Sequence, residues 1–361
     1  MTAFIPALPK MAQELGVSPD AVGLIISVYT LPGVIFMPLF GVLADRLGRR
    51  KVLVPALMLF GITGGLCGLV RDFNLLLTLR FLQGVGAASL VPLSWVIICD
   101  IYSGGERLAA TGYNASLISV GMAGFPALGG ALALLSWQYP FLLSLFAIAV
   151  GLLVLLALKN PEPNKEQRMG KYLREFWNSL KNLDALGLFV VNAFAFLVVY
   201  GAYMTYFPFL IESSFGASSL IIGLFLAMMF LIAAATASQL GKLARIFSRR
   251  NLLRLSFLLY ALALILIPLA PSLWLMPVLL VIFGVAQGLN EPVVMTLMAD
   301  MVPINHRAAF LAVNEMLLLL GITLGPILMG AIFGAWGISS VFFAGAGLAF
   351  AMFFVSLFAV K

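Results

Sequence analysis

The chain has 361 residues, of which 63% are hydrophobic and 10% are charged, and its formal net charge is +7. Soluble domains contain roughly 45–50% apolar and about 25% charged residues, so this composition excludes a soluble enzyme and a soluble binding module. Long unbroken apolar runs also disagree with an outer-membrane barrel, in which apolar and polar residues alternate over segments of about ten residues. The composition therefore predicts an all-α polytopic membrane protein.

Apolar runs bounded by polar turns predict eleven membrane spans, because a spanning helix needs about 20 mostly apolar residues. Before the first run, Met1 to Leu8 is apolar but too short to span, and it lacks the basic region of a signal peptide. The predicted spans are 20–41, 52–70, 74–99, 109–135, 138–158, 184–211, 218–241, 251–269, 273–299, 308–334 and 338–360.

Basic side chains gather in the loops on one side of these spans. When the loop after the first span is placed in the cytoplasm, the same side receives all but three of the 21 Lys and Arg residues. The exceptions are Lys10, Arg71 and Arg80, the last inside a span. Cytoplasmic loops of membrane proteins are rich in Lys and Arg, so the pattern predicts a topology in a plasma (inner) membrane, and no nucleic-acid partner is expected. The predicted cytoplasmic segments are the loops 42–51, 159–183 and 242–254 and the C-terminus.

The two halves of the chain repeat each other with an offset of 200 residues. The segment Gly41–Arg50 aligns with Gly241–Arg250, and Gln83-Gly84 resembles Gln287-Gly288 with a slip of four residues. The same offset pairs Asp100 with Asp300, Arg107 with Arg307, Asn114 with Asn314, Gly121 with Gly321, Pro126 with Pro326 and Gly130 with Gly330. Parallel repeats of this kind occur in transporters, with the substrate site between the repeats. The repeat predicts an N-terminal bundle at 1–158, a cytoplasmic linker at 159–183 and a C-terminal bundle at 184–361.

The loop that follows the first span carries a glycine- and charge-rich motif. Gly41 is expected to permit close helix approach and Gly48 to permit a tight turn. Asp45, beside several cations, is expected to form a charge network at the cytoplasmic face. The alternative interpretation is a basic loop that only sets topology. The motif residues are Gly41, Asp45, Arg46, Gly48, Arg49 and Arg50.

Two further motifs lie within predicted spans. Arg80 begins the segment Arg-Phe-Leu-Gln-Gly-Val-Gly-Ala-Ala, and a charged residue inside a span usually faces a cavity or a partner. Snorkelling of its side chain to the outer interface is the alternative. The second motif combines glycines with a proline kink, for which generic packing of small residues is the alternative. The packing residues are Gly121, Pro126, Gly129 and Gly130, with Gly325 and Pro326 in the second half.

Together these motifs resemble those of the major facilitator superfamily, in particular its twelve-helix drug:proton antiporter branch. The resemblance implies two pseudo-symmetric six-helix bundles, a latch function for the Asp45 network and a part in proton coupling for Arg80. The glycine–proline motif is similar to one associated with antiporters, although Phe125 stands where that motif has glycine. The segments Phe4–Pro9 and Gln13–Ser18 are similar to the residues just after the first helix in that branch, so most of that helix is expected to be missing.

Two acidic residues lie deep within predicted spans and are candidates for proton coupling together with Arg80. Glu291 precedes Pro292, which is expected to break the helix and open carbonyl groups to a cavity. Glu315 lies at a similar depth in the next span. The alternatives are a buried structural acid for Glu291 and pairing across the interface of the halves for Glu315. Candidates for substrate contact, each of which could instead serve packing, are Trp95, Asn192, Tyr200, Tyr203 and Asn290.

Other chemistry has little support in the sequence. Neither a phosphate-binding loop nor a catalytic cluster is present, Cys67 and Cys99 form no close pair, and His306 is the only histidine. We therefore expect a transporter rather than an enzyme, without cofactor or metal, acting as a monomer in the lipid bilayer. The predicted activity is proton-coupled efflux of small organic compounds by alternating access. The alternatives are a metabolite uniporter or symporter and, in another class, a non-transporting membrane sensor or an inactive truncated product.

Overall fold

The computed structural model describes residues 2–158, 183–301 and 307–359. The predicted linker therefore lies outside the described residues except for Leu183, and His306 and Lys361 lie outside them as well. Within the described part, eleven helices are long and apolar enough to cross a membrane, which confirms the predicted number. The chain is a multi-pass membrane protein.

Most helix boundaries lie within a few residues of the predicted ones. The largest differences are at the polar ends of the spans, where the helices continue into segments that carry charged residues. The first spanning helix, predicted to end at residue 41, reaches Leu47 and stops at Gly48, whose φ of 97° favours glycine. The candidate spans are Pro19–Leu47, Arg49–Cys67, Phe73–Ile101, Gly104–Leu135, Tyr139–Ala157, Leu186–Phe215, Ser219–Ser238, Arg249–Leu269, Leu273–Met298, Val313–Trp336 and Ile338–Phe358.

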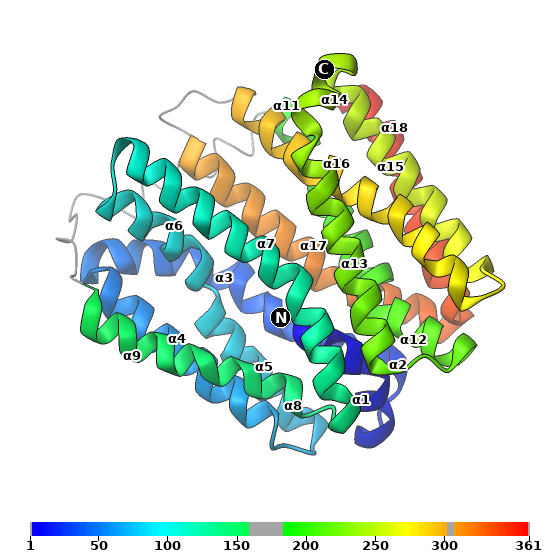
Figure 1. The fold of residues 1–361 in the computed structure, drawn as a ribbon, viewed down its shortest axis with the longest axis horizontal. Helices are drawn as coiled ribbons and strands as arrows, with labels where there is room; N and C mark the ends of the chain where they lie inside the picture. Colours follow the sequence, from blue (N-terminus) through cyan, green and yellow to red (C-terminus); the bar gives the residue numbers. More distant parts are fainter. Residues whose placement is uncertain (1, 159–182, 302–306, 360–361) are drawn as a thin grey trace.

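These helices form two bundles that lie side by side (Figure 1). The first bundle follows a short 3-10 helix, η1 (Thr2–Ala7), and the helix α1 (Leu8–Leu15). It consists of α2 (Pro19–Val22), α3 (Leu24–Leu47), α4 (Arg49–Cys67), α5 (Phe73–Ala87), α6 (Leu90–Ile101), α7 (Gly104–Leu135), α8 (Tyr139–Leu142) and α9 (Phe146–Ala157).

The second bundle contains the π-helix η3 (Val198–Met204) and two short 3-10 helices, η4 (Ile267–Leu269) and η5 (Leu273–Leu275). Its α-helices are α11 (Leu183–Leu197), α12 (Thr205–Phe215), α13 (Ser219–Ser238), α14 (Leu240–Ile246), α15 (Arg249–Leu266), α16 (Met276–Met301), α17 (Arg307–Trp336) and α18 (Ile338–Ala359).

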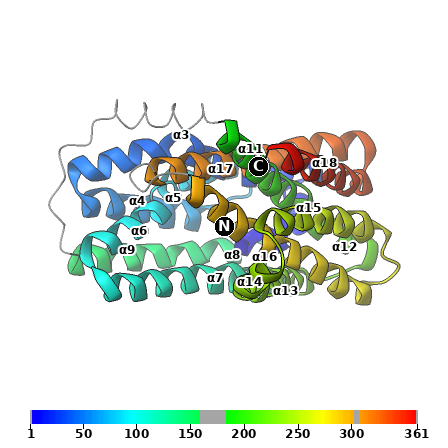
Figure 2. The ribbon, with the colours of Figure 1, turned by 90° about the horizontal axis from the view of Figure 1, so that it is seen from above.

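The bundles meet at two helix crossings, α7 with α13 and α3 with α17. Figure 2 shows these crossings along opposite edges of the molecule. At the first crossing, a Cβ added at Gly223 would overlap the carbonyl oxygen of Pro126, and one added at Gly130 would overlap that of Ser219. The backbones of α7 and α13 therefore touch because both positions lack a side chain.

The second crossing repeats the first with the offset of 200 residues. An added Cβ at Gly23 would lie 3.0 Å from the Cβ of Pro326, and one at Gly330 would lie 2.7 Å from the carbonyl oxygen of Asp20. Gly23 and Pro326 are thus the counterparts of Gly223 and Pro126 at the first crossing. The predicted pseudo-symmetry is therefore confirmed at the interface of the bundles by the glycine–proline contacts of both crossings.

Charged residues distinguish the two ends of the spans. One end, called here the basic end, carries the turns around Gly48 and Phe247 and most of the described Lys and Arg residues. The other, called here the acidic end, carries Lys10 and Arg71 as its described bases. Its described acids are Glu14, Asp20, Asp72 and Glu212.

The bundles touch toward the acidic end and separate toward the basic end. In α7, the six consecutive residues 115–120 are all exposed, which leaves more than one full helical turn uncovered by protein on every face. In the same helix, Pro126, Gly129 and Gly130 are buried near the acidic end. Figure 1 shows α7 and α13 converging at this end and diverging toward the other. The space between the bundles is therefore open at the basic end.

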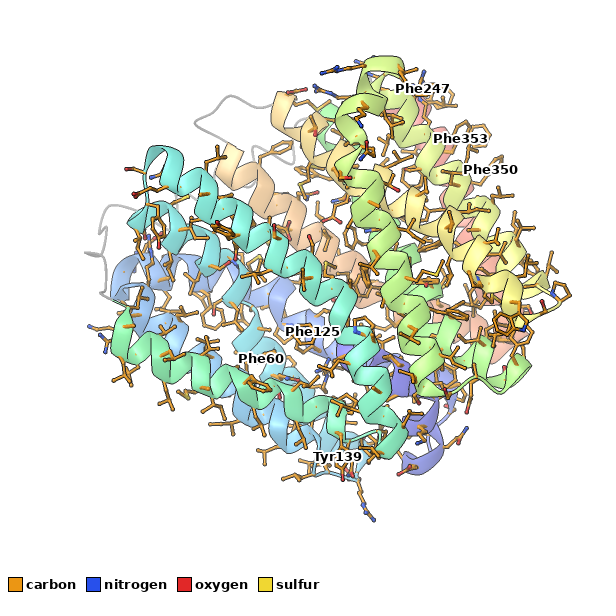
Figure 3. All side chains as sticks on the ribbon, in the orientation of Figure 1. Phe60, Phe125, Tyr139, Phe247, Phe350 and Phe353 are labelled. Carbon is orange, nitrogen blue, oxygen red and sulfur yellow. The ribbon has the colours of Figure 1, made fainter. Side chains whose placement is uncertain are left out.

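The periphery of the molecule is apolar and exposed, as a lipid-facing surface requires. Phe350 on α18 is 49% exposed at the outer edge of the second bundle (Figure 3). Exposed aromatic side chains also lie at both ends of the spans, with Tyr139 at the acidic end and Phe247 at the basic end (Figure 3). Aromatic residues are common at the two membrane interfaces.

Candidate functional site

Glu291 and Glu315 come from two helices of the second bundle, α16 and α17. Both side chains are only partly exposed, and α17 reaches α16 close to them, where Asn314 Nδ2 lies 4.0 Å from Met295 Sδ. The structure thus places the two predicted acids on either side of one contact between α16 and α17.

A chain of buried side chains leads from α15 to Glu291. The Tyr260 hydroxyl donates to Gln287 Oε1, and Gln287 Nε2 donates to Glu291 Oε2 at 3.4 Å. On the neighbouring turn, Asn290 Nδ2 donates to Ser256 Oγ at 3.0 Å. Asn290 is buried and its amide is held against α15, so polar contacts orient this face of α16.

The expectation that Pro292 breaks its helix is wrong. Helix α16 runs without interruption from Met276 to Met301. A proline removes one backbone N–H, and neighbouring helices and side chains can compensate for that loss in a membrane bundle. Glu291 is consequently presented by a regular helix instead of an unwound segment.

A buried amide pair connects α11 to α17 one residue before Glu315. Asn192 Nδ2 donates to Asn314 Oδ1 at 2.8 Å, and both residues are almost completely buried. Asn192 Oδ1 has no hydrogen-bond partner among the described residues. Asn192, predicted as a substrate contact, thus holds α17, the helix that carries Glu315. Its Oδ1 atom is left as an unused hydrogen-bond acceptor.

Tyr200 and Tyr203 lie in the π-helix η3, which passes α17 beside Pro326. A Cβ added at Gly201 would lie 2.8 Å from the carbonyl group of Gly325, so the two backbones touch where Pro326 follows. Tyr200 is buried and stacks on Phe196 with ring centroids 6.2 Å apart. Tyr203 stacks on Phe283 with ring centroids 4.3 Å apart, inside the second bundle. Both tyrosines therefore belong to buried aromatic pairs of the second bundle. π-Helical segments are frequent at functional sites.

Arg80 is buried in the first bundle, and its alternative placement at the interface is wrong because only 2% of the residue is exposed. Arg80 Nε donates to the Ile25 carbonyl oxygen at 3.3 Å and Nη1 donates to Gln83 Oε1 at 2.6 Å. The guanidinium carbon lies 4.4 Å from the ring centroid of Phe4 and 4.1 Å from that of Tyr29. Aromatic rings and neutral acceptors therefore hold this cation.

The motif at the basic end forms an ion-pair network within the first bundle. Arg49 pairs with Asp45 on the preceding turn and, through Nε at 3.0 Å, with Asp100 at the end of α6. Arg249 pairs with Asp300 at the equivalent positions of the second bundle. The first network is less exposed than its counterpart, and it ties α4 to α3 and α6.

The remaining motif residues have different placements. Gly48 has the expected positive φ, but Gly41 has no described atom within 4 Å of an added Cβ, so its expected close helix approach is not present. Arg46 is exposed at the end of α3, and Arg50 donates to the Leu158 carbonyl oxygen at 3.5 Å. Trp95 is half-buried on α6.

The glycines of the packing motif divide into two groups. Gly129 lies against the backbone of Ala3, and Gly130 lies at the α7–α13 crossing. Gly121, in contrast, has only the side chain of Phe125, among the described residues, within 4 Å of an added Cβ. The close approaches in α7 are therefore confined to its half near the acidic end.

Sequence reasoning missed three elements of this arrangement. Thr30 and Thr323 share a buried hydrogen bond of 2.8 Å between the bundles, and nothing in their spacing predicts it. Gly23 and Gly223 are related by the offset of 200, and this match in the sequence could have been used to predict the two crossings. Tyr260 could not be identified without the packing of α15 on α16.

Comparisons with known proteins agree with this architecture. The family model for the Major Facilitator Superfamily matches residues 1–235 and 188–361. Multidrug resistance protein 1 of Bacillus subtilis (strain 168) is 27% identical over 333 residues, which cover 91% of this chain and 85% of that protein. The bacillibactin exporter of the same organism is 33% identical over 145 residues, which cover 38% of this chain and 36% of that protein. A mutant of the nucleoside transporter NupG has the same fold, with a TM-score of 0.85 and 14% identity over 100% of this chain and 96% of that chain.

Proposed function

This chain belongs to the Major Facilitator Superfamily and is a membrane transporter, and we propose that it exports small organic compounds in exchange for protons. The observation that carries the proposal is the pair of acids, Glu291 and Glu315, on two helices of the second bundle that meet nearby at Met295 and Asn314. Charged groups inside a membrane bundle are expensive and are usually functional. The similarity to a multidrug resistance protein and to an exporter supports the direction of transport.

The proposed cycle is a competition between a proton and the substrate for the acidic pair. With Glu291 ionised, the space that opens at the basic end accepts a substrate. Protonation of Glu291 removes the charge that holds the substrate or resets the carrier. Arg80 is proposed to take part in coupling from the first bundle, and Trp95, Tyr200 and Asn290 to line the path. The bundles rock about the two crossings while the substrate keeps its covalent structure.

The basic end is proposed to be cytoplasmic, since cytoplasmic loops are rich in Lys and Arg. Residues 1–158 and 184–361 then form the two moving bodies, and residues 159–183 connect them on the cytoplasmic side of an inner membrane. We propose that one copy of the chain, without a cofactor, is the transporting unit.

The stoichiometric exchange can be tested in vesicles that contain the purified chain and a lumenal pH dye. Uptake of a fluorescent organic cation such as ethidium should remove protons from the lumen and make it alkaline. Acidification of the lumen would indicate a symporter, and an unchanged lumenal pH during uptake would indicate a uniporter. Either of those results would contradict the proposed exchange.

Asp45→Asn is expected to slow transport about fivefold, which corresponds to about 1 kcal/mol for a partly exposed ion pair. The substitution removes the acid that pairs with Arg49 at the basic end. Initial transport rates at equal protein amounts provide the measurement. Glu106→Gln is the matched control, because it removes an exposed acid at the same end. Equal rates in the two variants would show that the motif only sets topology.

A further inference from the structure

A cavity of about 350 Å³ lies at the acidic end, away from the carboxylate pair. One wall consists of residues from α1 and the start of α2, among them Gln13 and Pro19. The other wall comes from α12, α17 and the start of α18, with Phe209, Glu212 and Phe333. Gln13 Nε2 donates to Glu212 Oε1 at 2.9 Å across the cavity's edge. The cavity therefore exists only while the two sides of the molecule are in contact at this end.

The aromatic wall is held in place from behind. Tyr206 is buried, stacks on Phe333 with ring centroids 5.3 Å apart and lies 6.2 Å from the ring centroid of Phe209. Two phenyl groups that line the cavity thus share one rigid support. Preformed, mostly apolar cavities with few polar groups are typical of small-molecule sites.

Glu212 is the only ionisable residue among the described residues that line the cavity. A carboxylate offers about four acceptor positions, and the bond from Gln13 uses one of them. The neighbouring acids Glu14 and Asp20 add negative charge at this end, while the Lys10 ammonium donates to the carbonyl oxygens of Ala133 and Leu134 at the end of α7. The charge in and around the cavity therefore favours a cation.

From this geometry we infer that the cavity is a second ligand site, which binds small aromatic organic monocations. The cationic group lies against Glu212, and the apolar part lies against Phe209 and Phe333, whose rings also attract a cation. Since both walls are needed, an occupant binds this conformation better than one in which the acidic end is open and shifts the population toward it. A cation on the acidic side thus slows transport.

Protection of an introduced thiol tests the site without a transport assay. Ser213 is exposed and lines the cavity, so Ser213→Cys is made in a Cys99→Ser chain, where the remaining Cys67 is buried. In nanodiscs, benzyltrimethylammonium should protect this thiol from a maleimide, and benzoate should not. Equal protection by both probes, or protection by neither, would overturn the inference.

Charge variants then assign the site to Glu212. Glu212→Gln keeps an acceptor for Gln13 and should raise the half-protecting concentration of benzyltrimethylammonium at least about tenfold, as expected for loss of a charged partner. Asp72→Asn removes another acid from the same end and should leave that concentration unchanged. Glu291→Gln should also leave it unchanged, so this inference can fail or hold independently of the proposed exchange. A shift in Glu291→Gln without one in Glu212→Gln would place the cation in the path between the bundles and overturn the inference.

The effect on transport is measured with benzyltrimethylammonium on the acidic side only. Initial rates should fall in the original chain and remain unchanged in Glu212→Gln at the same concentration. Equal inhibition of both chains would contradict the link between the cavity and the conformation.

Discussion

Glu291→Gln is expected to abolish transport driven by a pH gradient, with uptake falling to the level of vesicles without protein. Glutamine has nearly the same volume and still accepts a hydrogen bond from Gln287 Nε2, so the contacts that orient this part of α16 remain. It cannot exchange a proton with water, and it carries no charge that competes for a substrate. Uptake in vesicles with and without an imposed pH gradient measures the effect.

Two controls separate coupling from folding. The thermal unfolding midpoint of Glu291→Gln should match that of the original chain, because a polar side chain of equal size replaces the acid. Glu315→Gln, in α17, should retain part of the gradient-driven uptake, since Glu291 still carries the proton. An unchanged pH dependence in Glu291→Gln would reject the role proposed for this residue.

Gly130→Ala is expected to lower the stability of the protein. Alanine favours a helix over glycine by roughly 0.5–1 kcal/mol. At this position, however, the added methyl group would overlap the backbone carbonyl oxygen of Ser219 and approach the Cα of Gly223 at 3.1 Å. Both obstacles are backbone atoms, so α7 and α13 must separate, and overpacking of this kind costs about 1–3 kcal/mol or more. The steric cost exceeds the gain in helix propensity, and the thermal unfolding midpoint should fall.

Gly124→Ala is the matched control for this substitution. Gly124 lies in the same helix, and an added Cβ there has no atom of the described residues within 4 Å. Its unfolding midpoint should therefore stay the same or rise slightly. Gly330→Ala, at the equivalent position of the second crossing, should behave like Gly130→Ala. Equal midpoints for Gly124→Ala and Gly130→Ala would contradict the close contact between the bundles.

The arrangement of the helices was largely predictable because it depends on composition and on the repeat. Long apolar runs define spans whatever their neighbours, and the offset of 200 residues relates Gly130 to Gly330 without any knowledge of packing. The turn at Gly48 was predictable for a similar reason, since the required backbone angle is a local property.

The partners of the functional side chains could not be predicted, because they depend on how helices rotate against one another. Glu291 is conspicuous in the sequence as an acid in an apolar run, whereas its connection through Gln287 to Tyr260 requires α15 to pack on α16. Arg80 was expected to face a cavity or the interface, but it is enclosed by aromatic rings that come from distant segments. Likewise, the regular course of α16 through Pro292 reflects its neighbours and not its local sequence.

Asp45 and Arg245 occupy equivalent positions of the two bundles, so an acid in one copy corresponds to a base in the other. A homodimer of a single bundle with the same crossings would carry identical residues at both symmetry-related positions. Fusion of two copies into one gene product removes that constraint. One copy can then acquire a three-residue charge network around Arg49 while the other keeps the simpler pair of Arg249 with Asp300. Covalent duplication thus allows the two bundles to diverge in function while their shared contact geometry is preserved.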